Sequence, residues 1–197
     1  ITKNKTHIPI WGIQITTPEV TQDFAKVVVN TEFVSAKKGA LAAETTIFNQ
    51  QGERVAHTNT KATAYTTDKI TSEMYIDKPR LWDIGAPNLY KAVTKLYEDG
   101  QLKDEVTTTF GVRTIELKPN DGLYLNNRKI KIQGVCMHHD LGPLGAAVNE
   151  SAIRRQLVIL RDMGVNAIRT SHNMPAPDYV RLADEMGMLL AVESFDE

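Results

Sequence analysis

The chain has 197 residues, enough for one large domain or two smaller ones. Its 42% hydrophobic and 24% charged residues are those of an ordinary globular protein. A formal net charge of -1 argues against a broad basic surface for nucleic acid or anionic membrane. No apolar run approaches the roughly 20 residues of a membrane-spanning helix. The single cysteine excludes an internal disulfide. We therefore expect neither nucleic acid nor a membrane as partner.

Residues 1–118 show the alternation of apolar and polar side chains that is typical of half-buried strands. The period of two is clear in three segments, residues 24–34, 41–47 and 70–76. Two further segments, 89–97 and 102–110, flank Asp99-Gly100, a pair that favours a hairpin because both residues tolerate positive φ. About seven short strands without helical periodicity predict an immunoglobulin-like β-sandwich over residues 1–118.

The pattern changes after residues 118–122, a polar stretch with Pro and Gly that predicts a domain boundary. A hairpin is expected next, in which Leu123–Leu125 and Lys129–Val135 flank the turn Asn126-Asn127. Residues 119–197 then form the second domain.

Helical spacing appears twice in this second part. We expect one helix over Ser151–Met163, capped by Asn149 or Ser151, and another over Pro177–Met186, stopped by Gly187. Strands are expected at residues 167–170 and 188–192, so the order is β-α-β-α-β, which predicts parallel strands with helices outside. About 80 residues carry this pattern, whereas a closed (β/α)8 TIM barrel needs roughly 250. The prediction is an incomplete TIM barrel, its first three β/α units.

Polar and titratable side chains follow each of the three predicted parallel strands. They are His138, His139, Asp140, His172, Asn173, Glu193 and Asp196. The carboxyl ends of parallel strands are where α/β proteins build ligand sites. Imidazoles and carboxylates there can bind sugar hydroxyls, hold a metal or transfer protons. The competing interpretation is a set of histidines satisfied within their own loops. The adjacent His138 and His139 are expected to point in opposite directions.

Three other side chains have structural interpretations. Arg169 lies in a predicted buried strand, where a charge is costly without a carboxylate partner, so we expect a structural ion pair inside the barrel. Cys136 is expected to be a small apolar filler rather than a nucleophile. Trp82 is expected in the sandwich core rather than as a platform for stacking sugars.

The stretch Asn166–His172, with Asp184, Gly187 and the apolar run Met188–Ala191, resembles the signature of glycoside hydrolase family 2. That family holds β-galactosidases, β-glucuronidases and β-mannosidases. The Gly134–Asp140 segment is similar to its first barrel strand and histidine-containing loop. Three segments resemble the end of its immunoglobulin-like domain: Pro79–Trp82, Pro87–Tyr90 and Phe110–Arg113.

The resemblance implies a retaining exo-β-glycosidase with two glutamates, both from later barrel strands. We therefore assign no catalytic residue to this chain, which we expect to be an inactive fragment of a larger parent. His138 and His172 match family positions that contact the sugar in the innermost subsite, and Asp140 and Glu193 are weaker candidates for that pocket. Asn173-Met174 stand where the family usually has Tyr-Pro, which bears on loop shape and sugar preference.

Further expectations also come from the family. Terminal β-galactosides are the first expected substrates, with β-glucuronides and β-mannosides behind them. No cofactor is expected, although a divalent cation or Na⁺ is possible in the full-length parent. A periplasmic or secreted location is a guess from the family. Three parallel strands also leave an open edge and an uncovered face, so we expect self-association through residues 123–197.

Two alternatives stay open. The sandwich can be a binding module for carbohydrate or protein, which predicts aromatic side chains grouped on one of its faces; the candidates are Trp11, Trp82, Tyr90 and Tyr97. The barrel part can instead belong to a metal-dependent hydrolase that uses His138, His139 and His172, although such enzymes often have His-x-His after the first strand.

Overall fold

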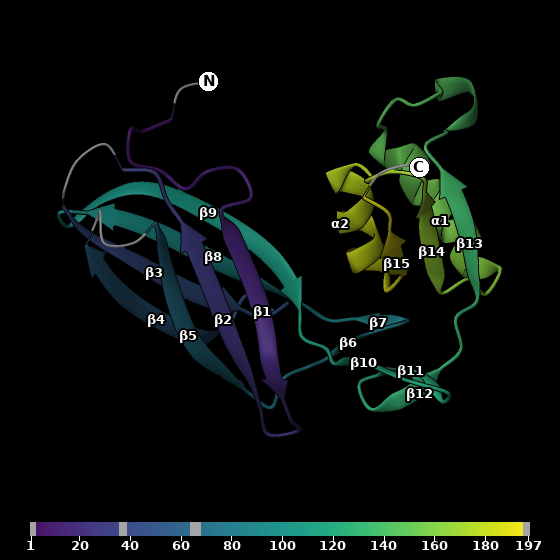
Figure 1. Ribbon diagram of the computed structural model, residues 1–197, viewed down its shortest axis with the longest axis horizontal. Helices are drawn as coiled ribbons and strands as arrows, with labels where there is room; N and C mark the ends of the chain where they lie inside the picture. Colours follow the sequence, from purple (N-terminus) through teal and green to yellow (C-terminus); the bar gives the residue numbers. More distant parts are fainter. Residues whose placement is uncertain (1–2, 36–38, 64–67, 195–197) are drawn as a thin grey trace. The chain divides into compact units, whose positions relative to one another are not determined.

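The computed structural model describes residues 3–35, 39–63 and 68–194, which fall into two compact units (Figure 1). The first unit holds the chain up to Arg80 together with Leu89–Val112. The second holds Leu81–Asn88 together with the chain from Arg113 onward. Contacts in the structure therefore group residues 113–118 with the second unit, whereas the sequence pattern placed them with the sandwich.

The first unit is built from two antiparallel sheets. One sheet has the strand order β1 (Ile13–Val20), β2 (Phe24–Glu32), β5 (Lys69–Asp77). The other has the order β4 (Arg54–Thr63), β3 (Ala40–Phe48), β8 (Leu89–Glu98), β9 (Gln101–Gly111). The predicted β-sandwich is confirmed.

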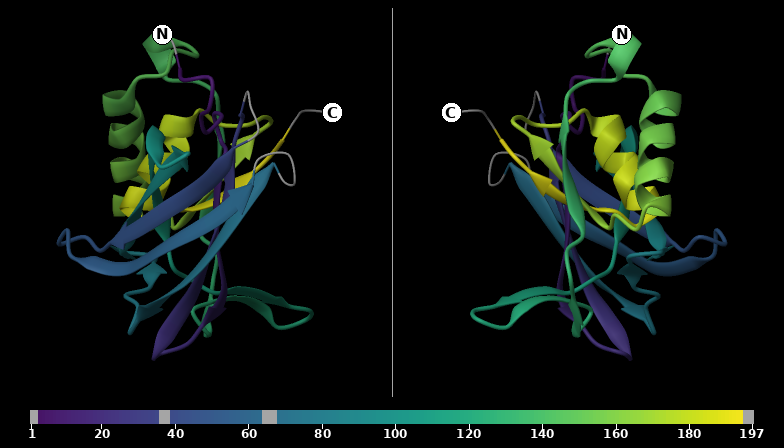
Figure 2. Two further views of the ribbon diagram at one scale, coloured as in Figure 1. Left: turned by 90° about the vertical axis from the view of Figure 1, so that its left-hand side faces the viewer. Right: turned by 90° about the vertical axis from the view of Figure 1, so that its right-hand side faces the viewer.

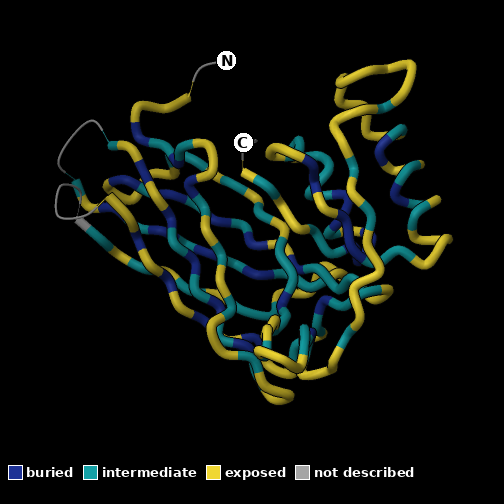
Figure 3. The backbone as a smooth tube through the Cα atoms, turned by 45° about the vertical axis from the view of Figure 1, so that its right-hand side comes forward, coloured by how far each residue is buried: buried dark blue, intermediate teal, exposed yellow. Residues whose placement is uncertain are grey.

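Alternation along the strands builds the sandwich core. Every second residue of β5 is buried, and β2 and β3 follow the same rule; Figure 3 shows the buried positions in dark blue. One core cluster joins Leu41 and Leu96 of one sheet to Ile70 of the other. The expected hairpin is present between β8 and β9, where Asp99 has φ 51° and Gly100 has φ 77°.

The second unit combines short antiparallel strands with a parallel sheet. The antiparallel strands are β6 (Trp82–Asp83), β7 (Ala86–Pro87), β10 (Ile115–Lys118), β11 (Gly122–Leu125) and β12 (Arg128–Ile130). The parallel sheet has the order β13 (Gly134–His138), β14 (Ala167–Ser171), β15 (Leu189–Val192). The helices are η1 (Gly142–Leu144), α1 (Glu150–Asp162) and α2 (Pro177–Met186). This parallel sheet with its helices confirms the predicted start of a TIM barrel.

Local sequence determines where the two helices begin and end. The side chain of Asn149 accepts a hydrogen bond from Ala152 N at 3.0 Å, which caps the first turn of α1. Pro177 stands at the first position of α2. Gly187 ends α2 with φ 69°, a left-handed conformation in which a side chain is strained. The expected helix Pro177–Met186 is confirmed residue for residue.

Both helices cover the same face of the parallel sheet (Figure 2). Leu157 of α1, Leu182 of α2 and Ile168 of β14 are fully buried in one cluster, and Val135 and Leu190 pack against it. The opposite face carries Cys136, Arg169 and Ala191, which are neighbours in the strand register and are exposed. This second face would line the interior of a closed barrel.

The expected strand Lys129–Val135 is wrong, because it is two strands with a break between them. β12 ends at Ile130 and β13 begins at Gly134. In the break, Asn166 donates its amide Nδ2 to Lys131 O at 2.9 Å, and its Oδ1 accepts from Gln133 N at 2.9 Å. The Asn166 side chain thus satisfies backbone groups that a continuous ladder would have used.

The short hairpin β6–β7 belongs to the second unit although its neighbours in sequence belong to the first. Trp82 is 1% exposed, and its ring lies 4.7 Å from the guanidinium carbon of Arg113. The expectation that Trp82 fills the sandwich core is therefore wrong: it belongs to the second unit, where its indole N–H donates to Asp184 O. Across the described residues, no helix is long and apolar enough to cross a bilayer.

Candidate active site

The strand register places the carboxyl ends of β13, β14 and β15 at one edge of the sheet. His138 pairs with Ser171, and Thr170 pairs with Val192. His172 and Glu193 directly follow these pairs, so they reach the same edge as His138. The structure thus brings together three of the four residues that the sequence singled out as site candidates.

Two imidazoles lie side by side at this edge. The ring centroids of His138 and His172 are 5.2 Å apart, and the ring planes meet at 74°. Both residues are exposed. The peptide bond between Ser171 and His172 is cis. Imidazole nitrogens can donate or accept hydrogen bonds, so this pair can bind the hydroxyl groups of a ligand at the rim.

Glu193 connects the histidine pair to the sheet. One carboxylate oxygen lies 3.4 Å from His172 Nδ1, and the other accepts hydrogen bonds from the guanidinium of Arg169. The backbone N–H of Glu193 donates to Thr170 Oγ1 at 3.2 Å. These contacts tie Glu193, which follows β15, to β14 and to the residue directly after it. The predicted ion pair of Arg169 is confirmed, although the Arg169 side chain is 47% exposed rather than buried.

Cys136 is part of the same group and is not an apolar filler, so that prediction is wrong. Arg169 Nη1 donates to Cys136 Sγ at 3.6 Å, and the thiol is exposed. This hydrogen bond is the main reason why the pKa of Cys136 lies below its usual value. The prediction for Cys136 fails because side chains alternate between the two faces of a strand. Val135 and Met137 point to the helices, so Cys136 lies on the opposite face together with His138.

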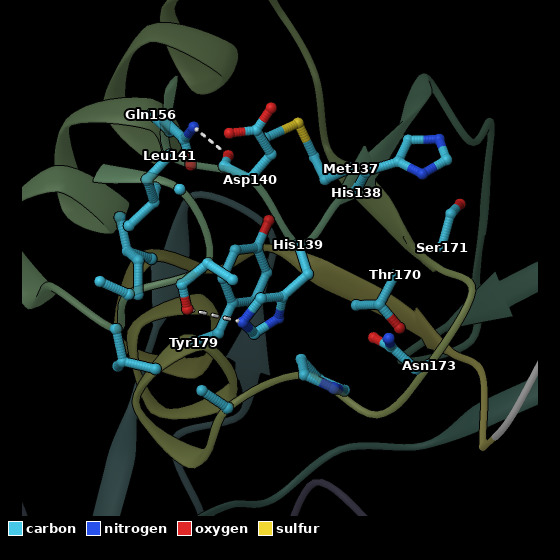
Figure 4. A pocket seen from close by; sticks show the side chains of 17 residues that line it. Met137, His138, His139, Asp140, Leu141, Gln156, Thr170, Ser171, Asn173 and Tyr179 are labelled. Atoms are coloured by element: carbon cyan, nitrogen blue, oxygen red, sulfur yellow. Dashed lines mark hydrogen bonds between the residues drawn. The ribbon is translucent and has the colours of Figure 1, made fainter. Parts of the chain in front are cut away.

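Asp140 and His139 lie in the loop after β13 and turn away from the histidine pair. Asp140 Oδ1 accepts a hydrogen bond from Gly142 N at 2.7 Å, which shapes the loop itself. His139 Nε2 lies 3.1 Å from Ala146 O and acts as donor there, since a carbonyl oxygen only accepts. The expected opposite orientation of His138 and His139 is confirmed (Figure 4).

A small cavity lies beside this loop, and His138 is one of its lining residues whereas His172 is not. It measures about 50 Å³ and is lined by the loop after β13, by the start of α1 and by Asn173 and Tyr179 (Figure 4). Asn173 therefore lines this cavity, and Asp196 lies outside the described residues. We call this cavity the loop pocket; its polar lining side chains are His138, His139, Asp140, Gln156, Thr170, Ser171, Asn173 and Tyr179.

The two alternatives can be compared with this geometry. Within residues 3–35, 39–63 and 68–194, no three His, Cys, Asp or Glu side chains come together as a metal-binding group. The three-histidine set of the metal-dependent alternative is thus not assembled. Trp82 is buried in the second unit, and Tyr90 is buried, so the four aromatic candidates do not gather on one sandwich face.

Comparison with known proteins agrees with this architecture. Residues 6–113 match the model of glycosyl hydrolases family 2, and residues 115–196 match the TIM barrel domain of the same family. Beta-galactosidase BoGH2A of Bacteroides ovatus is 41% identical over 194 residues, which cover 96% of this chain and 23% of the relative. A beta-glucuronidase of Bacteroides fragilis is 34% identical over 121 residues, covering 61% of this chain and 17% of the relative.

Solved structures give the same result. The crystal structure of a glycosyl hydrolase family 2 member from Bacteroides cellulosilyticus has a TM-score of 0.93 and 33% identity, and the match covers 98% of this chain and 26% of that one. The Bacteroides uniformis beta-glucuronidase has a TM-score of 0.82 and 25% identity, and the match covers 94% of this chain and 24% of that one. The chain thus spans about a quarter of the length of such relatives or less. It belongs to glycosyl hydrolases family 2.

Proposed function

We propose that the chain supplies part of the innermost sugar subsite of a retaining exo-β-glycosidase that hydrolyses terminal β-galactosides. The observation that carries the proposal is the exposed pair of imidazoles, 5.2 Å apart, at the carboxyl ends of two adjacent parallel strands. A beta-galactosidase at 41% identity supports the choice of galactosides, and the beta-glucuronidases among the relatives make glucuronides the second choice.

His138 and His172 bind hydroxyl groups of the sugar in this proposal. A carboxylate oxygen only accepts hydrogen bonds, so Glu193 at 3.4 Å favours the proton of His172 on Nδ1. Neutral His172 then presents Nε2 as an acceptor for a sugar hydroxyl. Glu193 acts mainly as a positioning residue, because its carboxylate is occupied by Arg169 and lies against His172.

The bond-breaking chemistry comes from two glutamates outside residues 1–197. One attacks the anomeric carbon while the other protonates the leaving oxygen, and water then hydrolyses the glycosyl-enzyme with the second glutamate as base. Asp140 is the weaker candidate for a sugar contact, since one of its oxygens already serves the loop.

The test compares three aryl glycosides on the full-length protein: a β-galactoside, a β-glucuronide and a β-mannoside. We expect the highest kcat/KM on the galactoside and a fall of about 100-fold in His172→Ala, because hydrogen bonds to sugar hydroxyls that strengthen in the transition state contribute several kcal/mol. His57→Ala is the matched control, because His57 is an exposed sandwich residue that bonds Thr46.

Preference for the glucuronide would overturn the choice of sugar, and an unchanged kcat/KM in His172→Ala would overturn the role of the histidine. The 197-residue chain alone is expected to give no turnover, because neither glutamate is present in this proposal. Measurable hydrolysis by the purified chain that His172→Ala abolishes would contradict that assignment.

A further inference from the structure

Tyr179 on α2 has a buried hydroxyl group that finds no partner among the residues the structure describes. The hydroxyl oxygen is shielded from bulk solvent, and its hydrogen-bonding capacity is unused within the described part of the chain. Burial raises the pKa of Tyr179 to about 12. Buried hydroxyls in folded proteins are almost always satisfied by protein groups or by ordered water. Tyr179 lines the loop pocket, so a partner for its hydroxyl can be located there.

The loop pocket has the size and the polar lining for water. About 10–15 Å³ is enough for one water molecule, so its 50 Å³ holds a few. A bound water needs two to four polar partners. Besides Tyr179, the lining offers the amide of Asn173 and the imidazole of His139. Because His139 Nε2 donates to Ala146 O, its Nδ1 is left as an acceptor in the neutral ring.

The loop between β13 and α1 packs Leu141 against the apolar cluster, and its polar tie to a neighbouring helix is to α1. Gln156 of α1 donates to Asp140 O at 3.4 Å, and other bonds lie within the loop. Among the described residues, no direct hydrogen bond joins residues 139–148 to α2. A polar connection between this loop and α2 therefore needs a molecule bound in the loop pocket, where it can hydrogen-bond to lining residues of both.

We propose that the loop pocket holds ordered water molecules that hydrogen-bond to Tyr179 Oη and join residues 139–148 to α2. Through this bridge Tyr179 acts as a positioning residue for the loop that directly follows His138. The proposal stands on the second unit alone and does not depend on which sugar the family member cleaves.

The test uses Tyr179→Phe in the 197-residue chain, with Tyr75→Phe as matched control because Tyr75 is 53% exposed. A crystal structure without polyol cryoprotectant is expected to show water within hydrogen-bond distance of Tyr179 Oη in the parent and to lose it in Tyr179→Phe. Amide hydrogen exchange in residues 139–148 is expected to become about fivefold faster, as for the loss of one net hydrogen bond. Tyr75→Phe is expected to leave it unchanged.

The direction of the change in Tm separates the proposal from a dry pocket. If water satisfies the hydroxyl, its removal lowers the Tm or leaves it unchanged. If the hydroxyl is dry and unsatisfied, Tyr179→Phe removes a cost and raises the Tm. A higher Tm with unchanged exchange in residues 139–148 would overturn the proposal, as would a parent structure in which a protein group bonds Tyr179 Oη.

Discussion

Trp82 donates its indole N–H to the carbonyl oxygen of Asp184 at 2.8 Å, across 102 positions of the sequence. Asp184 lies in the last turn of α2, so this bond satisfies a carbonyl group near the helix end. The backbone carbonyl of Trp82 in turn accepts from Asn126 Nδ2 at 2.9 Å. Through its side chain and its backbone carbonyl, Trp82 thus connects the β6–β7 hairpin to α2 and to the turn between β11 and β12.

We predict that Trp82→Ala destabilises the second unit by about 3–5 kcal/mol, the range for deleting a large buried aromatic side chain. Trp82→Phe keeps most of the apolar contact and loses the hydrogen bond to Asp184, so its cost should be smaller by several-fold. Urea unfolding followed by far-UV circular dichroism measures both. Equal stability of parent and Trp82→Ala would show that the hairpin is not part of this core.

Gly187→Ala is predicted to cost more than about 2 kcal/mol, because it adds a steric clash to an unfavourable backbone conformation. A Cβ at Gly187 would lie 2.8 Å from Gly85 N and 3.0 Å from Asp83 O. Gly52→Ala is the matched control, since Gly52 has φ 79° but nothing within 4 Å of the added carbon. Thermal unfolding of the two variants separates the effects; equal losses of Tm would rule out the clash.

The reactivity of Cys136 is predicted to depend on Arg169. Arg169 lowers the pKa of the thiol, so more thiolate is present at neutral pH, and the thiolate is the form that reacts. In Arg169→Gln this pKa rises, and alkylation by iodoacetamide at pH 7 should slow by about three- to tenfold. Cys136 is the only cysteine in the sequence, so mass spectrometry reports it directly.

Arg155→Gln serves as control for the alkylation experiment, because Arg155 is an exposed residue of α1 on the helix side of the sheet. Its rate should equal that of the parent at every pH. A pH–rate profile that is the same for Arg169→Gln and the parent would contradict the assignment of the thiol pKa to Arg169.

Self-association of the 197-residue chain through residues 123–197 remains a prediction. Strands β13 and β15 are the edges of the parallel sheet, and Val192 on β15 is 45% exposed. Unpaired strand edges and exposed apolar side chains favour pairing with a second copy. Sedimentation should show an average mass that rises with concentration. Val192→Lys should shift the equilibrium towards monomer, whereas Gln51→Lys in an exposed sandwich turn should not; a monomer at all concentrations would contradict the prediction.

Local patterns were sufficient for most of the fold. The bounds of the helix Pro177–Met186 are predictable because each end has its own local signal: Pro177 is its first residue and Gly187 directly follows its last. The β8–β9 hairpin followed from Asp99-Gly100 for the same reason. The break between β12 and β13 was missed because its cause is the side chain of Asn166, which lies 33 and 35 positions from the groups it bonds.

In the candidate site, too, the features with a local signal are predictable and those that depend on distant side chains are not. Strand order predicted that His138, His172 and Glu193 reach one edge, since parallel strands share their direction. The contacts among them depend on side-chain orientation, which strand order does not supply. The exposure of Cys136 would have followed from counting alternate residues back from His138. The burial of Trp82 against α2 has no local signal at all.

Because the chain leaves the sandwich for Leu81–Asn88, returns to it and leaves again at Arg113, no single cut separates the two units. A gene fusion that replaced the sandwich with that of a relative would also replace Trp82 and its hairpin. A chimaera of two family members joined at one point is therefore stable only if the hairpin of one parent packs against α2 and Gly187 of the other. These distant positions should have changed in step during the divergence of the family.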